Sequence, residues 1–315
     1  MKLSLNQKIY FVSILLFISI ALFIIYGIDM NHLEYALSQR IPKIFAMVLG
    51  GGCIAFTTVV FQTITNNQIL TPSVLGLDSL YVMIQTIIVF IFGSSSSLII
   101  NENYNFIINV AMMIGASLLL YKTLFEKNKN NIFFLILVGM IFGTLFKSAT
   151  TFIQVMIDPN EFLALQTSIM ASLNNINTNV LFIIIIAIIP FIYDEIKYLD
   201  VLSLGKEQAI NLGVDFDKAV KKMIILIAIL VSISTALIGP MTFLGLLLAN
   251  ITREIFKTYK HTYLISGSML IGMITLIIGQ FFIQHVFKFD TTLSVVINFI
   301  GGIYFIQLLL KGANR

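Results

Sequence analysis

Charged side chains are scarce in this 315-residue chain. Asp, Glu, Lys and Arg together make up 11% of it, whereas 58% of its residues are hydrophobic. A soluble domain carries roughly 25% charged residues, because its surface has to face water. The deficit excludes an ordinary soluble protein and predicts an all-α, polytopic membrane protein.

Cysteine and paired histidines are lacking as well. The single Cys53 allows neither an intrachain disulfide nor a cysteine metal cluster. His32, His261 and His285 fall in three different connections, and none is accompanied by a second histidine or a carboxylate at metal-ligand spacing. We expect these histidines to be solvated, and we expect no metal site, no cofactor and no catalytic cluster.

A nucleotide-binding loop is also missing. No stretch fits G-x-x-x-x-G-K-[ST], since the glycines at 50–52 have no following lysine and the Gly-Lys pair at Gly205 lacks the other motif residues. Energy for any uphill transport would come from another polypeptide or from an ion gradient. Gradient-driven carriers commonly bury acidic residues in mid-span, but here only Asp78 falls within an apolar run. A secondary transporter is therefore the less favoured alternative.

Long apolar runs are abundant. About 20 apolar residues cross the hydrocarbon core of a bilayer as a helix. Ten runs are read as spans, at residues 9–28, 42–63, 74–93, 105–121, 132–155, 178–193, 222–239, 241–256, 263–284 and 293–310. The eighth is short and follows Gly239-Pro240 almost without a loop. The first is interpreted as a retained span, because no small-residue cleavage site follows it.

The distribution of Lys and Arg agrees with ten spans, because these residues are held on the cytoplasmic side. With both termini in the cytoplasm, most of the 19 basic residues lie on that side. The exceptions are Arg40, Lys43, Lys147 and Lys288. We predict a multi-pass protein of the cell membrane. The net charge of +4 follows from this sidedness and does not indicate nucleic acid as a partner.

One large polar segment, LSLGKEQAINLGVDFDKAVKK at 202–222, lies between two apolar runs on the predicted cytoplasmic side. Residues 206–212 predict a short helix that stops at Gly213, a residue suited to the left-handed conformation past a helix end. Asp215 predicts the cap of a second helix that continues into the seventh span. Such a pair suits a groove on a soluble partner, and a solvated loop with an interfacial helix is the alternative.

Several separated stretches carry a family resemblance. They are QRIPKIFAMVLGGGCIAF at 39–56, FQTITNNQILTPSVLGLDS at 61–79, the polar segment at 202–222, GPMTFLGLLLANITREIFKTYKH at 239–261 and TTLSVVINFIGGIYFIQLLLK at 291–311. Together they resemble the ten-span FecCD-type permeases of ATP-binding-cassette (ABC) importers for iron–siderophore complexes, haem and cobalamin. The chain departs from that pattern at 67–69, which replaces Asn-Pro-Leu, at 249–250, which replaces Pro-His, and after Gly301, where the usual proline is absent.

The resemblance implies the type II ABC importer permease fold, with one transmembrane domain over residues 1–315 and coupling helices at about 203–220. It implies transport of a ferric siderophore, and TFLGLLLANITRE favours the catecholate type; haem and cobalamin are alternatives. The implied partners are a separate ATPase subunit, an extracellular or periplasmic substrate-binding (lipo)protein and a second permease subunit, identical or similar. The chain itself would perform no bond chemistry.

Coupling to the ATPase is implied for the residues that match the coupling-loop pattern, namely Leu204, Gly205, Glu207, Ala209, Leu212 and Gly213. Arg40 matches a position that receives a glutamate of the binding protein in such importers; a headgroup anchor is the alternative. Lys288 is the cation nearest to the second docking position, whose neighbourhood holds Gln284 and His285.

The remaining candidates concern the transport pathway. Lys147 lies inside the fifth span, where it either attracts an anionic chelate or extends toward the outer interface. Gln62, Asn66 and Asn67 are candidates for a cytoplasmic gate, with capping and interhelical hydrogen bonding as the alternative. The glycines at 50–52 are expected to serve close helix packing.

Overall fold

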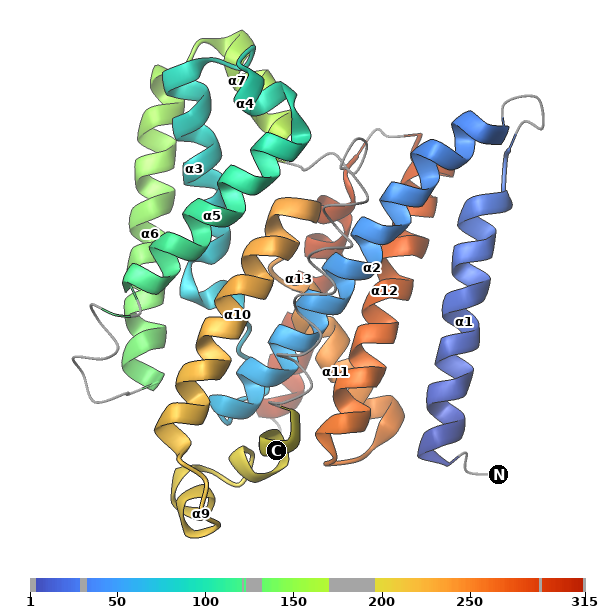
Figure 1. Cartoon of the computed structure of the whole chain (residues 1–315), viewed down its shortest axis with the longest axis vertical. Coiled ribbons are helices and arrows are strands. Elements are labelled where there is room, and N and C mark those ends of the chain that lie inside the picture. Colours follow the sequence, from blue (N-terminus) through green and yellow to red (C-terminus); the bar gives the residue numbers. More distant parts are fainter. Residues whose placement is uncertain are drawn as a thin grey trace.

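The computed structural model describes residues 4–28, 33–120, 122, 132–169, 196–288 and 291–313. Within these ranges the chain is built of helices and turns and contains no strand (Figure 1). The predicted all-α fold is therefore confirmed.

The helices follow one another along the chain in two described groups. The first group is α1 (Leu5–Ile25), α2 (Leu33–Ile64), the 3-10 turn η2 (Pro72–Leu75), α3 (Leu77–Phe92), α4 (Ser97–Ile100), α5 (Glu102–Leu120), α6 (Ile132–Met156) and α7 (Pro159–Ile169). The second is a helical stretch at 196–202, α9 (Lys206–Asn211), α10 (Phe216–Ile238), α11 (Leu244–Phe256), α12 (His261–His285) and α13 (Leu293–Ala313).

Nine of these helices correspond to predicted spans: α1, α2, α3, α5, α6, α10, α11, α12 and α13. The sixth predicted span, 178–193, lies outside the described residues. Among the described helices α1, α2, α6, α10 and α12 are each long and apolar enough to cross a membrane, and α3 and α13 contain shorter apolar stretches. The short helices α4 and α7, both near one end of the bundle, were not predicted (Figure 1).

Helix α2 lies at the centre of the bundle and packs against α10, α11 and α12. Its small residues permit this, since a Cβ added to Gly51 would lie 2.8 Å from the carbonyl oxygen of Gly272 in α12. A Cβ on Gly50 would meet Ile238 of α10 at 3.0 Å. Close packing is thus the role that the structure gives to these glycines, as expected.

A second close contact joins the start of α3 to α6. Gly76 has a φ of +78°, which turns the chain from η2 into α3. A Cβ at this position would lie 2.7 Å from the Cα of Gly143 in α6. Both the backbone conformation and the lack of space therefore require glycine here.

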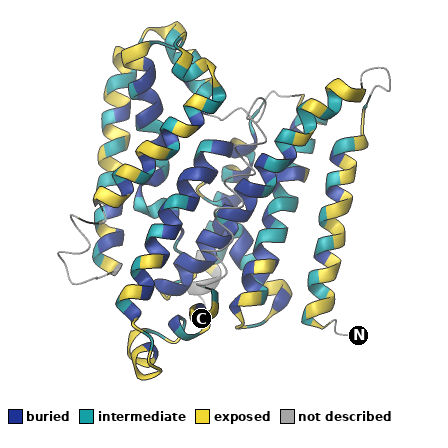
Figure 2. Ribbon diagram, in the orientation of Figure 1, coloured by how far each residue is buried: buried dark blue, intermediate teal, exposed yellow. Residues whose placement is uncertain are grey.

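The two ends of the bundle differ in character. Helix α9 protrudes at the end where α1 begins, and α4 and α7 lie at the opposite end (Figure 1). Buried residues concentrate in α2 and α10, whereas the outward face of α1 is exposed (Figure 2). The polar segment is thus held at one end of an apolar bundle.

Candidate functional site

The polar segment folds as the sequence predicted. Helix α9 ends at Asn211 with Leu212 as its C-cap, and Gly213 follows with a φ of +83°. Asp215 caps α10, because its Oδ1 accepts a hydrogen bond of 3.2 Å from the backbone N–H of Lys218. Two short-range signals, a glycine stop and an aspartate cap, therefore set the angle between α9 and α10.

Ion pairs support this corner from the outside. Lys206 Nζ lies 2.9 Å from Asp217 Oδ1 and joins α9 to α10. Lys218 Nζ lies 2.8 Å from Asp215 Oδ2. The hydrogen bonds from the Lys218 side chain and backbone lower the pKa of Asp215, and Asp215 raises the pKa of Lys218. Because both groups are solvent-exposed, these pairs set geometry more than they add stability.

Apolar side chains of the segment point into solvent. Leu204 is 57% exposed, Ile210 53% and Leu212 62%, at the end of the molecule where α9 protrudes. Gly205 and Glu207 are intermediate-to-exposed in the same turn, whereas Ala209 is fully buried. A protrusion that combines exposed leucines with charge is suited to contact another protein. Ala209 supports it from beneath.

The C-terminal end of α2 is a hydrogen-bonded junction. Arg253 Nη1 of α11 donates to Gln62 Oε1 at 2.6 Å, and Gln62 Nε2 donates to the Gln68 carbonyl at 2.7 Å. Asn66 takes a positive φ of 49° just past the helix, and Asn67 Oδ1 accepts a backbone N–H two residues further on. The three gate candidates therefore lie together, and in this state they act as cap, turn and interhelical tie.

A cavity of about 490 Å³ lies beside this junction. Gln62, Asn66, Arg253, Lys257 and His261 line it, together with residues of the neighbouring turns. It reaches Ser203 at the start of the polar segment. Two of the gate candidates, Gln62 and Asn66, thus border the same space as Ser203 of the polar segment.

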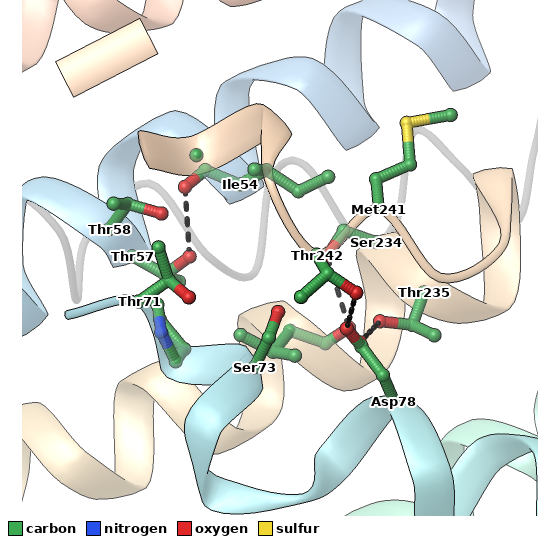
Figure 3. A pocket seen from close by; sticks show the side chains of 13 residues that line it. Ile54, Thr57, Thr58, Thr71, Ser73, Asp78, Ser234, Thr235, Met241 and Thr242 are labelled. Carbon is green, nitrogen blue, oxygen red and sulfur yellow. Dashed lines mark hydrogen bonds between the residues drawn. The ribbon is translucent and has the colours of Figure 1, made fainter. Parts of the chain in front are cut away.

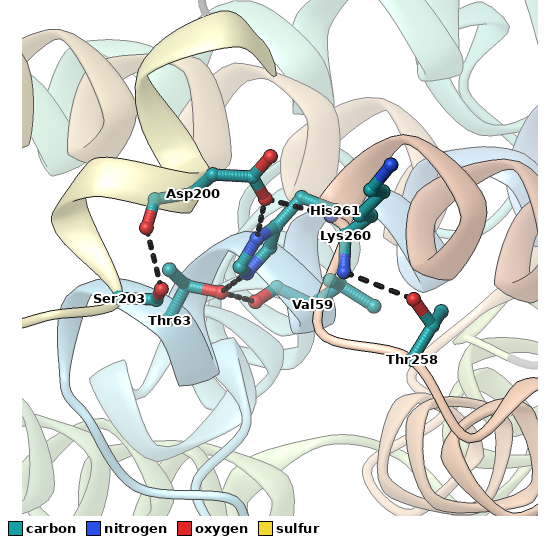
Figure 4. A network of polar contacts seen from close by, with 7 residues as sticks. All are labelled: Val59, Thr63, Asp200, Ser203, Thr258, Lys260 and His261. Carbon is teal, nitrogen blue, oxygen red and sulfur yellow. Dashed lines mark hydrogen bonds and ion pairs between the residues drawn. The ribbon is translucent and has the colours of Figure 1, made fainter.

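The expectation that His261 is solvated is wrong. Its residue is only 6% exposed. Nδ1 lies 2.6 Å from Asp200 Oδ1 and Nε2 lies 2.8 Å from Thr63 Oγ1 (Figure 4). His285 is partly buried, and its ring stacks on Phe281 at a centroid distance of 4.5 Å. His32 lies outside the described residues.

Asp78 joins α3 to α10 and to the connection before α11. Thr235 Oγ1 and Thr242 Oγ1 donate to its two carboxylate oxygens at 3.4 and 3.3 Å (Figure 3). The adjoining cavity, about 20 Å³, has room for about one water molecule. Asp78 also lies in the first turn of α3, where a helix favours negative charge. The carboxylate is thus a tie between helices, in a space too small for a metal chelate.

Arg40 caps the end of α1. Its Nη1 donates to the carbonyl oxygens of Phe23, Ile24 and Tyr26 at 2.9, 2.6 and 2.9 Å. A guanidinium at the C-terminal end of a helix satisfies carbonyls that have no partner within the helix. Sequence reasoning missed this role, because nothing local to Arg40 indicates which carbonyls it reaches.

The other two cationic candidates, Lys147 and Lys288, are exposed. Lys288 lies in the turn after α12 with a φ of +48°. Lys147 lies on an exposed face of α6 and so points away from the described helices. Among the described residues no group of three or more His, Cys, Asp or Glu could hold a metal ion.

These features define a multi-pass α-helical membrane protein with a protrusion of exposed apolar and charged side chains at one end. The sequence pattern of the FecCD transport family matches residues 8–311, and the chain belongs to this family. It is 56% identical over 309 residues to the petrobactin import system permease protein YclO of Bacillus subtilis (strain 168), covering 97% of this chain and 98% of that protein.

A second permease of the same named system in that organism, YclN, is 22% identical over 280 residues and covers 87% of this chain and 85% of its own length. A solved structure described as an inward-facing metal-chelate type ABC transporter shares the fold. Its TM-score is 0.83 at 21% sequence identity, covering 97% of this chain and 99% of the other. The predicted permease fold is confirmed by this likeness.

Proposed function

We propose that this chain is a permease subunit of an ABC importer that moves a ferric siderophore across the cell membrane, with petrobactin, of the catecholate type, as the preferred cargo. The observation that carries the proposal is the 56% identity to a petrobactin import permease along nearly the whole chain. Haem and cobalamin become the less favoured cargoes, because the similar permease is named for a siderophore.

A separate ATPase subunit supplies the energy and binds the coupling segment, which is the part of the polar segment at about residues 203–220. The exposed Leu204, Ile210 and Leu212 support this interaction, together with the absence of a nucleotide-binding loop. The face that carries α9 is then cytoplasmic, along with both termini, and the whole chain acts as a single transmembrane domain.

A second permease subunit completes the pathway. Two different permeases, YclO and YclN, carry the name of one Bacillus subtilis import system, and this chain is far more similar to the first. We therefore favour a heterodimer with a YclN-like chain over a homodimer. Lys147, exposed in the isolated chain, then lines the pathway between subunits, and Gln62, Asn66 and Asn67 form part of its inner gate.

A substrate-binding protein docks at the opposite face and delivers the cargo. Arg40 and Lys288 are the cations that we assign to this contact. Arg40 uses Nη1 to cap α1, so docking would use the rest of its guanidinium group, which presents five N–H donors in all. Complementary charge at such a contact fixes register and speeds encounter.

Reconstitution of the chain with its partner permease, ATPase and binding protein tests the proposal. Glu207→Lys reverses charge on the protrusion, and Gly213→Ala places a side chain where φ is +83°. We expect each to lower uptake per ATP hydrolysed by at least about fivefold, the scale of coupling between sites. Glu254→Lys, on the exposed surface of α11, is the matched charge reversal and should transport normally.

Three results would contradict the assignment. Normal coupling in Glu207→Lys and Gly213→Ala would remove the polar segment from ATPase contact. Uptake of haem or cobalamin in preference to ferric petrobactin would change the cargo. Ion-driven uptake without the ATPase, abolished by Asp78→Asn, would favour the secondary transporter.

A further inference from the structure

Three elements distant in sequence meet at the His261 side chain. Asp200 belongs to the helical stretch at 196–202, His261 opens α12, and Thr63 lies in the last turn of α2. Asp200 Oδ1 lies 2.6 Å from Nδ1 and also accepts the backbone N–H of His261 at 2.8 Å. Thr63 Oγ1 lies 2.8 Å from Nε2 (Figure 4).

One donor of this contact can be assigned. The Asp200 carboxylate can only accept, so Nδ1 of His261 donates to it. The Thr63 hydroxyl has one proton and lies 2.8 Å from both His261 Nε2 and the carbonyl oxygen of Val59, so it joins the histidine to the last turn of α2.

Two of the three side chains are buried, so the loss of one contact would destabilise the arrangement. Thr63 is 7% exposed and His261 6%, whereas the Asp200 side chain is 48% exposed. Removing one partner of a buried hydrogen bond leaves the other unsatisfied, which costs more than the bond itself contributes. The histidine therefore holds α2 and the 196–202 stretch in one relative position.

The position of this contact joins two functional parts of the chain. Asp200 lies immediately before the coupling segment, and Ser203 Oγ donates to the Asp200 carbonyl at 2.7 Å. Thr63 is adjacent to Gln62, which Arg253 ties to α11. A displacement of α9 by the ATPase would thus act on Asp200 first and on the inner end of α2 through His261.

We infer that Asp200, His261 and Thr63 form a positioning link that transmits movement of the coupling segment to the inner gate at the end of α2. The inference rests on the proposed function, since it assigns the route between the ATPase contact and the gate. Discrete hydrogen bonds of 2.6 and 2.8 Å suit this role, because they break and re-form as a unit when two elements shift.

The decisive variant is Thr63→Val, which removes the hydroxyl and keeps the shape. Thr65→Val is its matched control, because Thr65 is 5% exposed and donates at 2.7 Å to the carbonyl of Phe61 without touching His261. In the reconstituted importer, Thr63→Val should raise the ATP hydrolysed per cargo molecule by about 2- to 30-fold, the range for residues in coupling networks. Thr63→Ser should restore the wild-type ratio.

Asp200→Asn provides a second readout that does not depend on Thr63→Val folding well, since by itself it should also raise the ATP hydrolysed per cargo molecule, and together with Thr63→Val it completes a double-mutant cycle. Asp200→Asn alters the half-exposed end of the link, and its effect on the ratio should be much smaller in the Thr63→Val background than in the wild type. Thermal stability of each purified variant is measured alongside, and a structural role alone would lower stability without changing the ratio.

The outcomes separate this inference from the proposed function. An importer that shows no ATP-driven uptake in its wild-type form would overturn the proposed function. Wild-type uptake together with equal ratios for Thr63→Val and Thr65→Val, or with additive effects in the cycle, would overturn the link alone.

Discussion

Helices α1 and α2 are neighbours in sequence and almost equally apolar, yet they occupy opposite environments. Their most apolar windows have mean hydropathies of 2.6 and 2.2, but 17% of the first and 83% of the second is buried (Figure 2). Apolarity does not decide burial here, because lipid tails are as apolar as a protein core. Side-chain size and hydroxyl content decide it instead.

The composition of the two helices shows the difference. Helix α1 is rich in Ile, Leu and Phe, with Phe11, Phe17 and Ile25 more than half exposed. Helix α2 contains three consecutive glycines and several threonines whose hydroxyls donate to its own carbonyls, as Thr57 does to Cys53 at 2.8 Å. Small residues let backbones approach, and internally bonded hydroxyls add no unsatisfied group.

The largest effect is expected from Gly51→Leu. The new side chain would meet the backbone of Gly272, which cannot move aside as a side chain can, so the cost exceeds the about 1–3 kcal/mol of ordinary overpacking. We expect little folded protein in gel filtration of detergent extracts. Gly115→Leu is the control, because Gly115 is exposed on α5 and a Cβ there meets nothing within 4 Å.

Equal yields of the two leucine variants would contradict this assignment. They would mean that α2 and α12 can separate without loss of the fold, and the central position of α2 would then not depend on its glycines. A yield lost for Gly115→Leu alone would instead indicate that α5 has a partner surface.

An intermediate effect is expected when the same substitution, Phe→Ala, is made separately in α2 and in α1. Phe56 in α2 is fully buried, and Phe17 in α1 is 70% exposed. Phe→Ala costs about 3–5 kcal/mol in soluble cores. The part of this cost that comes from moving the side chain out of water is small for a helix in lipid. Phe56→Ala should therefore lose only its packing contacts, and it should still lower the melting temperature measurably. Phe17→Ala should leave it unchanged, and similar shifts for both would refute the contrast.

The fold could be predicted from sequence because its signals are local and repeated. Apolar runs of sufficient length and a one-sided distribution of Lys and Arg predicted the spans, and nine have described helices. The helices α4 and α7 were missed, since α4 has only four residues and α7 only 11, too few for an apolar run that crosses a membrane. The order of burial was also missed, because hydropathy alone cannot tell a lipid-facing helix from a central one.

The candidate site could be predicted from sequence only where its signals are local. The Gly213 stop and the Asp215 cap depend on residues within about one turn, and both were predicted. The partners of His261 lie 61 and 198 positions away in the sequence, and no local pattern identifies them. A polar residue that opens an apolar helix, as His261 does, was the only available signal.

The smallest effect is expected at Arg40, whose hydrogen bonds join α2 to the end of α1. Arg40 of α2 caps α1 through three carbonyls, and the loss of such bonds should cost about 1 kcal/mol. Arg40→Gln should therefore raise amide hydrogen exchange around residues 23–28 while the melting temperature changes little. Exchange that stays unchanged would refute the cap.

The same residue also tests docking, because the two roles respond differently to charge and salt. Arg40→Lys keeps the charge but cannot present a planar fork of donors, so it should loosen α1 while preserving affinity for the binding protein. Arg40→Glu should weaken docking most at low salt, where screening is least. If Arg40→Glu loosened α1 but docked normally at every salt concentration, Arg40 would belong to the cap alone, and Lys288 would be the cation to test next.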